Sequence, residues 1–232
     1  MTGPAKPRRI HPILLILAGV LGAVWFWSAA IRGNLSPKNF GTVDQGRVYR
    51  SGQLTPSAMR RVVEKHKIKT VIDLGSYWDG PRLAEPEGER LNQRVADAMG
   101  VTRYVMPLYG DGTGNANWYI HALRIMTDPR NQPVLVHCGA GSERTSCASI
   151  LYDQLRNQST IEEGIATART FRHNPDRNPH VTEVLRTLGP EILEHVKGGG
   201  MLSDPRFPAI PAPRPVTNPD GATEATATAP GR

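Results

Sequence analysis

The chain has 232 residues, with 28 Lys or Arg and 21 Asp or Glu, so its formal net charge is +7. Its two cysteines cannot form the framework of a disulfide-rich domain, and its seven histidines are scattered, so we expect no metal and no cofactor. The positive charge suits an anionic substrate or surface, whereas the lack of interleaved basic and aromatic residues argues against a nucleic-acid partner. The length allows one domain with tails.

The N-terminal segment has the pattern of a membrane anchor. Residues 1–12 form a basic head without acidic residues, and residues 13–31 contain no charged residue. At about 1.5 Å per residue, such a helix is just long enough to cross a hydrocarbon core of about 30 Å. The sequence therefore predicts a single-pass anchor with a cytoplasmic head and an extracytoplasmic domain. The alternative is a protein secreted after signal-peptide cleavage near residues 28–30.

After a predicted polar linker at residues 32–46, strands and helices alternate through a domain that we expect at residues 47–198. We predict strands at residues 70–74, 103–108 and 134–136, and helices at residues 55–67, 85–99, 117–127, 144–155, 161–171 and 181–196. This alternation favours an α/β fold with a parallel or mixed sheet that is covered on both faces. Residues 199–232 are rich in Pro, Ala and Thr, which predicts a disordered tail.

The most informative stretch is residues 133–145, Pro-Val-Leu-Val-His-Cys-Gly-Ala-Gly-Ser-Glu-Arg-Thr. It predicts a buried strand, a tight glycine loop and the start of a helix. Such a loop directs main-chain N–H groups inward, which creates an anion site and favours the thiolate form of Cys138. Arg144 can bind two phosphate oxygens with its planar guanidinium. The Thr145 hydroxyl can donate to the Cys138 sulfur.

This stretch resembles the signature of the cysteine-dependent protein tyrosine and dual-specificity phosphatases, which is His-Cys, five residues, Arg, and Ser or Thr. The matching positions are His137, Cys138, Gly141, Arg144 and Thr145. The small bacterial, plant and fungal members also begin with a segment similar to residues 49–53, so the resemblance covers about residues 46–196. It implies the three-layer fold of that family, with a central and mostly parallel sheet flanked by helices.

The resemblance also implies roles for individual residues. Cys138 would be the nucleophile that forms a cysteinyl-phosphate, and Arg144 would bind the phosphoryl group during catalysis. The loop that binds the phosphate would consist of Gly139, Ala140, Gly141, Ser142, Glu143 and Arg144. His137 and Thr145 would support this loop. Arg50 and Ser51 either shape the pocket or have ordinary surface roles.

A general acid must protonate the departing alkoxide or phenoxide. In the family this acid is an Asp on a mobile loop upstream of the signature. Asp111 is the main candidate because its loop contains three glycines; Asp79 is the alternative, and Asp73 is expected to be structural. Cys147 is either a small buried residue or a thiol that protects oxidised Cys138.

Taken together, these patterns predict a membrane-anchored phosphatase that acts on phosphotyrosine or phosphoserine/threonine in proteins, or on another small phosphomonoester. Family members that act on highly phosphorylated inositols tend to carry Lys in the signature loop, and residues 139–143 contain none. An inositol phosphate phosphatase remains the alternative, and a catalytically weak phosphopeptide-binding module is the alternative of another class. A sulfur transferase or arsenate-type reductase is disfavoured by the length and late position of the loop.

Overall fold

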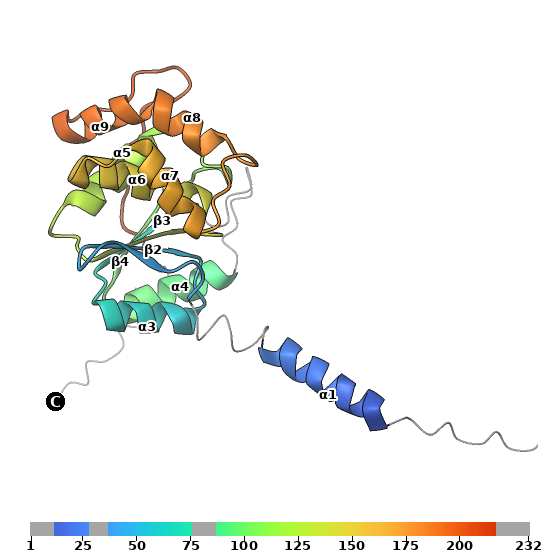
Figure 1. Cartoon of the computed structure of the whole chain (residues 1–232). Coiled ribbons are helices and arrows are strands. Elements are labelled where there is room, and N and C mark those ends of the chain that lie inside the picture. Colours follow the sequence, from blue (N-terminus) through green and yellow to red (C-terminus); the bar gives the residue numbers. More distant parts are fainter. Residues whose placement is uncertain (1–11, 28–36, 76–86, 217–232) are drawn as a thin grey trace, which may run out of the picture. The chain divides into compact units, whose positions relative to one another are not determined.

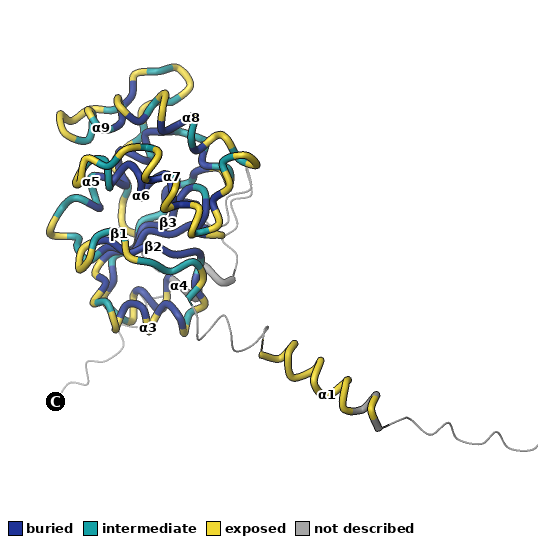
Figure 2. The backbone as a smooth tube through the Cα atoms, viewed as in Figure 1, coloured by how far each residue is buried: buried dark blue, intermediate teal, exposed yellow. Residues whose placement is uncertain are grey.

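The computed structural model describes residues 12–27, 37–75 and 87–216. The chain divides into two compact units, residues 1–36 and residues 37–232. The first unit contains helix α1 (Pro12–Phe26), whose described side chains are apolar and exposed (Figure 2). Among the residues that the structure describes, no helix combines the length and the apolar character needed to cross a membrane.

This finding corrects the predicted transmembrane anchor at residues 13–31 and the extracytoplasmic location that followed from it. Helix α1 has 15 residues, which corresponds to about 22 Å at 1.5 Å per residue, whereas a bilayer core is about 30 Å thick. The basic head up to residue 11 and the predicted cleavage site at residues 28–30 lie outside the described residues.

The second unit is built on a five-stranded sheet with the order β1-β2-β5-β3-β4. The strands are β1 (Gly41–Asp44), β2 (Val48–Gly52), β3 (Thr70–Asp73), β4 (Thr102–Val105) and β5 (Val134–Cys138). Strand β1 is antiparallel to β2, and the other neighbours are parallel. The predicted α/β fold with a mostly parallel sheet is confirmed, and β5, which carries the signature, lies at its centre.

Helices cover both faces of the sheet (Figure 1). They are α3 (Pro56–His66), α4 (Glu87–Ala98), α5 (Asn117–Thr127), α6 (Glu143–Asn157), α7 (Ile161–Thr170), α8 (His180–Thr187) and α9 (Gly189–Gly198). Helices α3 and α4 lie on one face, and α5, α6 and α7 lie on the other, with α8 and α9 beyond them. This arrangement gives three layers, with an additional pair of helices on one side.

The two hydrophobic cores follow from the alternation of side chains along each strand. In the central strand, Leu135 belongs to the core under α3 and α4, whereas Val134 and Val136 belong to the core under α5 and α6. The ends of the helices follow local signals, as in α3, where the Thr55 side chain accepts a hydrogen bond from Ala58 N. The sheet thus places the carboxyl end of β5 between two packed layers.

Three segments differ from the sequence predictions. Strand β1 lies within the predicted linker at residues 32–46. The helix predicted at residues 181–196 is two helices, because Pro190 cannot donate a main-chain hydrogen bond and the chain turns at Leu188.

The third difference is the predicted disordered tail at residues 199–232. Leu202 is buried, and its N–H donates to the side chain of Asn117 at 2.8 Å. Val216 N donates to the Arg103 carbonyl oxygen of β4 at 2.7 Å. The segment up to residue 216 therefore packs on the domain, and residues 217–232 lie outside the described residues.

Candidate active site

The signature loop connects the central strand to helix α6 at the carboxyl edge of the parallel strands. Cys138 is the last residue of β5, opposite Gly52 of β2, and α6 begins at Glu143. Gly141 has a φ of 77°, and a Cβ atom there would lie 2.7 Å from the main-chain carbon of Ser51. Only glycine combines this left-handed backbone with so close an approach to β2.

The candidate nucleophile, Cys138, is only 1% exposed, and its sulfur accepts a hydrogen bond from Gly141 N at 3.2 Å. The predicted hydrogen bond from Thr145 is not made. The Thr145 hydroxyl is buried and has no hydrogen-bond partner in the described part of the chain. In this structure a main-chain amide, rather than a hydroxyl, donates to the sulfur.

Arg144 is buried at the start of α6, and its Nη1 contacts main-chain oxygens on two neighbouring loops. Nη1 donates to Leu74 O at 3.1 Å and to Leu108 O at 3.2 Å, and it also contacts Gly75 O. Its Nε is buried and has no hydrogen-bond partner among the described residues. An unsatisfied buried donor on a cation is costly, so this atom is suited to an anionic oxygen of a substrate.

A second buried arginine, Arg50, donates a hydrogen bond to the signature loop. Its side chain extends from β2, and Nη2 donates to Gly141 O at 2.6 Å and to Ser146 Oγ at 3.0 Å. The guanidinium lies 3.9 Å from the ring centroid of Phe171. Burial lowers the pKa of Arg50 to about 10, although the nearby Cys138 acts in the opposite direction. The sequence left two roles open for Arg50, shaping the pocket or an ordinary surface role. The sequence feature that pointed to the first was its position in the family-like segment at residues 49–53.

Two polar residues from the predicted linker also contact the signature loop. Lys38 Nζ donates to Gly139 O at 2.8 Å, and Asn39 Nδ2 donates to Ala140 O at 3.0 Å. Lys38 is exposed, so its ammonium group is close to both the loop and solvent. The loop has no Lys in its own sequence, but the fold supplies one from 101 residues away.

Asp111 lies in the loop after β4, and its carboxylate is bonded within that loop. Asp111 Oδ1 accepts hydrogen bonds from Thr113 N at 2.9 Å and from Thr113 Oγ1 at 2.7 Å. Burial acts to raise the pKa of Asp111, but these hydrogen bonds and the nearby His180 outweigh it, so the pKa lies below its ordinary value. In this conformation the hydrogen bonds from Thr113 therefore favour the ionised form of the Asp111 carboxyl group.

The other two aspartates named in the sequence analysis are Asp73 and Asp79. Asp73 is buried and forms an ion pair with Arg103 at 2.8 Å, which agrees with the expected structural role. Asp79 lies outside the described residues.

Two groups inside the domain are held in their neutral forms. His137 is buried, and this burial lowers the pKa of its imidazole, with opposing contributions from Asp73 and Arg103. Cys147 is fully buried, and burial raises the pKa of its thiol to about 12 despite a hydrogen bond with Tyr119. Of the two predicted alternatives for Cys147, its burial therefore favours a small buried residue over a thiol that protects Cys138.

The signature loop and the Asp111 loop are linked through Glu143, which the sequence placed in the phosphate-binding loop, and through Asn178, which the sequence did not single out. Glu143 Oε2 is 2.6 Å from His173 Nδ1 and accepts a hydrogen bond from Asn178 Nδ2 at 3.0 Å. The same Asn178 Nδ2 donates to Asp111 O at 2.9 Å. The fold therefore brings Cys138, Arg144 and the Asp111 loop to one edge of the sheet.

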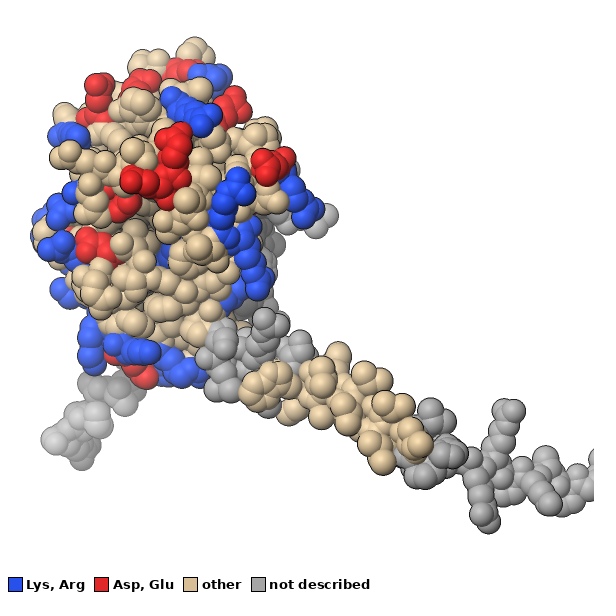
Figure 3. Space-filling model, in the orientation of Figure 1, with Lys and Arg blue, Asp and Glu red and all other residues tan. Residues whose placement is uncertain are grey.

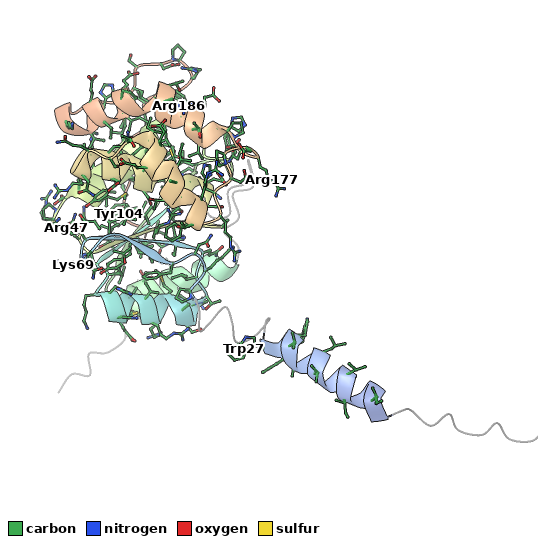
Figure 4. The ribbon with its side chains drawn as sticks, in the orientation of Figure 1. Trp27, Arg47, Lys69, Tyr104, Arg177 and Arg186 are labelled. Atoms are coloured by element: carbon green, nitrogen blue, oxygen red, sulfur yellow. The ribbon has the colours of Figure 1, made fainter. Side chains whose placement is uncertain are left out.

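Two exposed cations lie on the connection between α7 and α8, which supplies His173 and Asn178. Arg172 and Arg177 are exposed, and each is the sequence neighbour of a residue that contacts Glu143. Figure 4 shows Arg177 at the edge of the domain, on the connection between α7 and α8. A separate group of basic side chains lies over α3 (Figure 3), where Arg60, Arg61 and Lys65 are exposed.

Comparisons with known proteins identify relatives in sequence. The curated protein inositol diphosphatase SIW14 of Saccharomyces cerevisiae is 28% identical over 129 residues, which cover 54% of this chain and 42% of that protein. Inositol diphosphatase DSP1 of Oryza sativa subsp. japonica is 33% identical over 115 residues, which cover 48% of this chain and 47% of that protein. The chain thus spans about half the length of the curated relatives that it matches.

Solved structures show the same fold. The core catalytic domain of the PP-IP phosphatase SIW14 from S. cerevisiae aligns with a TM-score of 0.53 and 23% identity, over 71% of this chain and 96% of that one. PTPMT1 aligns with a TM-score of 0.52 and 18% identity, over 68% and 98%. A profile of the tyrosine phosphatase family matches residues 32–159, which is more than half of the chain. The chain therefore belongs to the tyrosine phosphatase family.

Proposed function

We propose that this protein is a cysteine phosphatase that acts on small, multiply phosphorylated substrates of the inositol diphosphate class. The Cys138 thiolate attacks the terminal phosphorus, and the bond from phosphorus to the leaving oxygen breaks. Arg144 binds the transferred phosphoryl group, and Asp111 protonates the leaving oxygen where that oxygen requires it. Water then hydrolyses the cysteinyl-phosphate and releases inorganic phosphate. The catalytic unit comprises residues 37–216.

The observation that carries this proposal is the lysine at the mouth of the signature loop. Lys38 Nζ lies 2.8 Å from the carbonyl oxygen of Gly139, the residue that follows the nucleophile. Its ammonium group is available to a second phosphate beside the one that Arg144 binds. Exposed Arg172 and Arg177 add positive charge to the connection between α7 and α8, which supplies His173 and Asn178. A substrate with several phosphate groups uses all of these charges, whereas a single phosphomonoester uses few of them.

The state of Asp111 also favours a diphosphate. Its carboxylate accepts two hydrogen bonds from Thr113 and has a lowered pKa, so a smaller fraction of Asp111 carries a proton at a given pH. The leaving group of a diphosphate is itself a phosphate, which departs with less help from an acid than an alkoxide does. A site of this kind is therefore better matched to a phosphoanhydride than to an alkyl ester.

The curated relatives named above, from yeast and rice, are both inositol diphosphatases. The chain spans about half of each, and their activity supports the proposal. The competing candidate is a phosphatase of phosphotyrosine or phosphoserine/threonine in proteins, which the signature stretch at residues 133–145 equally allows.

A substrate panel distinguishes the two candidates. The full chain is assayed for phosphate release from an inositol diphosphate, an inositol hexakisphosphate, a phosphotyrosine peptide and a phosphoserine peptide, with Cys138→Ser as the inactive control. We expect the highest kcat/KM for the inositol diphosphate, and Lys38→Ala should lower it without a comparable effect on the peptides. Preferential hydrolysis of either peptide would overturn the proposed substrate class, and activity retained in Cys138→Ser would overturn the mechanism.

A further inference from the structure

One side chain on the connection between α7 and α8 contacts both loops of the candidate site. Asn178 Nδ2 donates to the main-chain oxygen of Asp111 at 2.9 Å and to Glu143 Oε2 at 3.0 Å. Asp111 is the proposed acid, and Glu143 directly precedes Arg144 in the signature loop. Asn178 therefore forms a direct link between the acid loop and the phosphate-binding loop.

The hydrogen bonds of Asn178 require an amide in one orientation. Its Nδ2 carries two hydrogens, which match the two acceptors, and its Oδ1 accepts from His180 N at 3.3 Å. A flipped amide would place its oxygen against both acceptors, so the network fixes the assignment of nitrogen and oxygen. An Asp of the same shape at this position could satisfy neither acceptor.

Both ends of this link are held by further contacts. On the signature side, Glu143 Oε2 is also 2.6 Å from Nδ1 of His173, whose side chain is 0% exposed. On the acid side, the next carbonyl of the loop, Gly112 O, accepts a hydrogen bond from the buried Tyr119 hydroxyl at 2.8 Å. The carbonyl groups of Asp111 and Gly112 thus accept hydrogen bonds from the side chains of Asn178 and Tyr119. Of these two side chains, Asn178 also contacts the signature loop through Glu143.

We infer that Asn178 is a positioning residue that sets the distance between the Asp111 carboxyl group and the phosphoryl group bound by Arg144. This inference rests on the proposed function, in which Asp111 supplies a proton to the leaving group. It predicts that loss of the Asn178 amide impairs only those reactions that need the acid. Phosphoryl transfer to Cys138 with a leaving group that departs unaided should be nearly unaffected.

The test compares two aryl phosphates with the full-length protein. Phenyl phosphate has a poor leaving group that needs the acid, whereas 2,4-dinitrophenyl phosphate has a good one. Asn178→Asp should lower kcat/KM for phenyl phosphate by about 10²-fold, the effect of a misplaced catalytic group, and should change the value for the dinitrophenyl ester by less than about threefold. Asn178→Ala, which adds no negative charge beside Glu143, should show the same selectivity.

A matched control and a double-mutant cycle separate positioning from a general loss of stability. Asn174 lies in the same connection, and among the residues that the structure describes its side chain accepts hydrogen bonds only from Asp176 N and Arg177 N, both within that connection. Asn174→Ala should therefore affect both substrates equally and weakly. In an Asp111→Asn background, Asn178→Asp should cause no further loss, because the two changes act through the same proton transfer.

Equal losses with both substrates, or independent losses in the double variant, would overturn the role of Asn178 and leave the proposed function intact. If Asp111→Asn itself shows no dependence on the leaving group, the acid assignment and the inference both fail. Thermal unfolding of each variant identifies any that is poorly folded, in which case Asn178→Ala replaces Asn178→Asp in the cycle.

Discussion

Replacement of Gly141 by Ala tests whether the close contact between the signature loop and β2 controls both stability and catalysis. A non-glycine residue in the left-handed conformation costs about 1–2 kcal/mol, and Gly141 has a φ of 77°. The new Cβ would also lie 2.7 Å from the main-chain carbon of Ser51, so the main chain must shift. Such overpacking costs a further 1–3 kcal/mol or so, which gives a total of about 2–5 kcal/mol.

Gly100→Ala is the matched control, because Gly100 has a φ of 64° but nothing within 4 Å of its hypothetical Cβ. Gly100→Ala should lower the free energy of unfolding by only the about 1–2 kcal/mol that the left-handed backbone costs, and it should leave turnover unchanged. Gly141→Ala should also lower kcat by about 10²-fold, since the Gly141 amide that contacts the Cys138 sulfur is displaced. Urea unfolding and 4-nitrophenyl phosphate hydrolysis provide the two measurements. Equal destabilisation by both variants, with full activity in Gly141→Ala, would refute the reasoning.

Three further variants have expected outcomes. Cys138→Ser should abolish turnover and retain phosphate binding, measured by calorimetry, because a hydroxyl is far less ionised than a thiol. Asp111→Asn should lower turnover of phenyl phosphate by about 10²–10⁴-fold. Because the folded-state pKa of Asp111 is lowered, its ionised form contributes stability that is present above about pH 4 and lost as the pH falls through that pKa. Asp111→Asn should therefore weaken the loss of stability in acid, measured by urea unfolding at pH 3 and pH 6. Leu202→Ala should destabilise the domain by about 2–4 kcal/mol, whereas a residue in a disordered tail would cause no change.

The central part of the candidate site could be predicted from the sequence because its determinants are local. The strand, the glycine loop and the start of a helix lie within residues 133–145, and each follows from the preferences of adjacent residues. The same holds for α3, whose first turn is fixed by Thr55 and Pro56. The apolar run at residues 13–31 shows the limit of such patterns, since hydropathy indicated the composition of α1 but not where the helix ends.

The partners of the signature loop were decided by the tertiary structure. The loop is contacted by Lys38, Arg50 and Asn178, which lie 35 to 101 residues from their partners in the sequence. No local sequence pattern predicts such contacts. The segment up to residue 216 was also mispredicted, because main-chain hydrogen bonds to Asn117 and Arg103 hold it in addition to the burial of Leu202. Every residue except proline carries both a main-chain donor and a main-chain acceptor, so composition cannot reveal which of them find partners. Only the folded surface, which places a matching donor or acceptor opposite each group, determines that outcome.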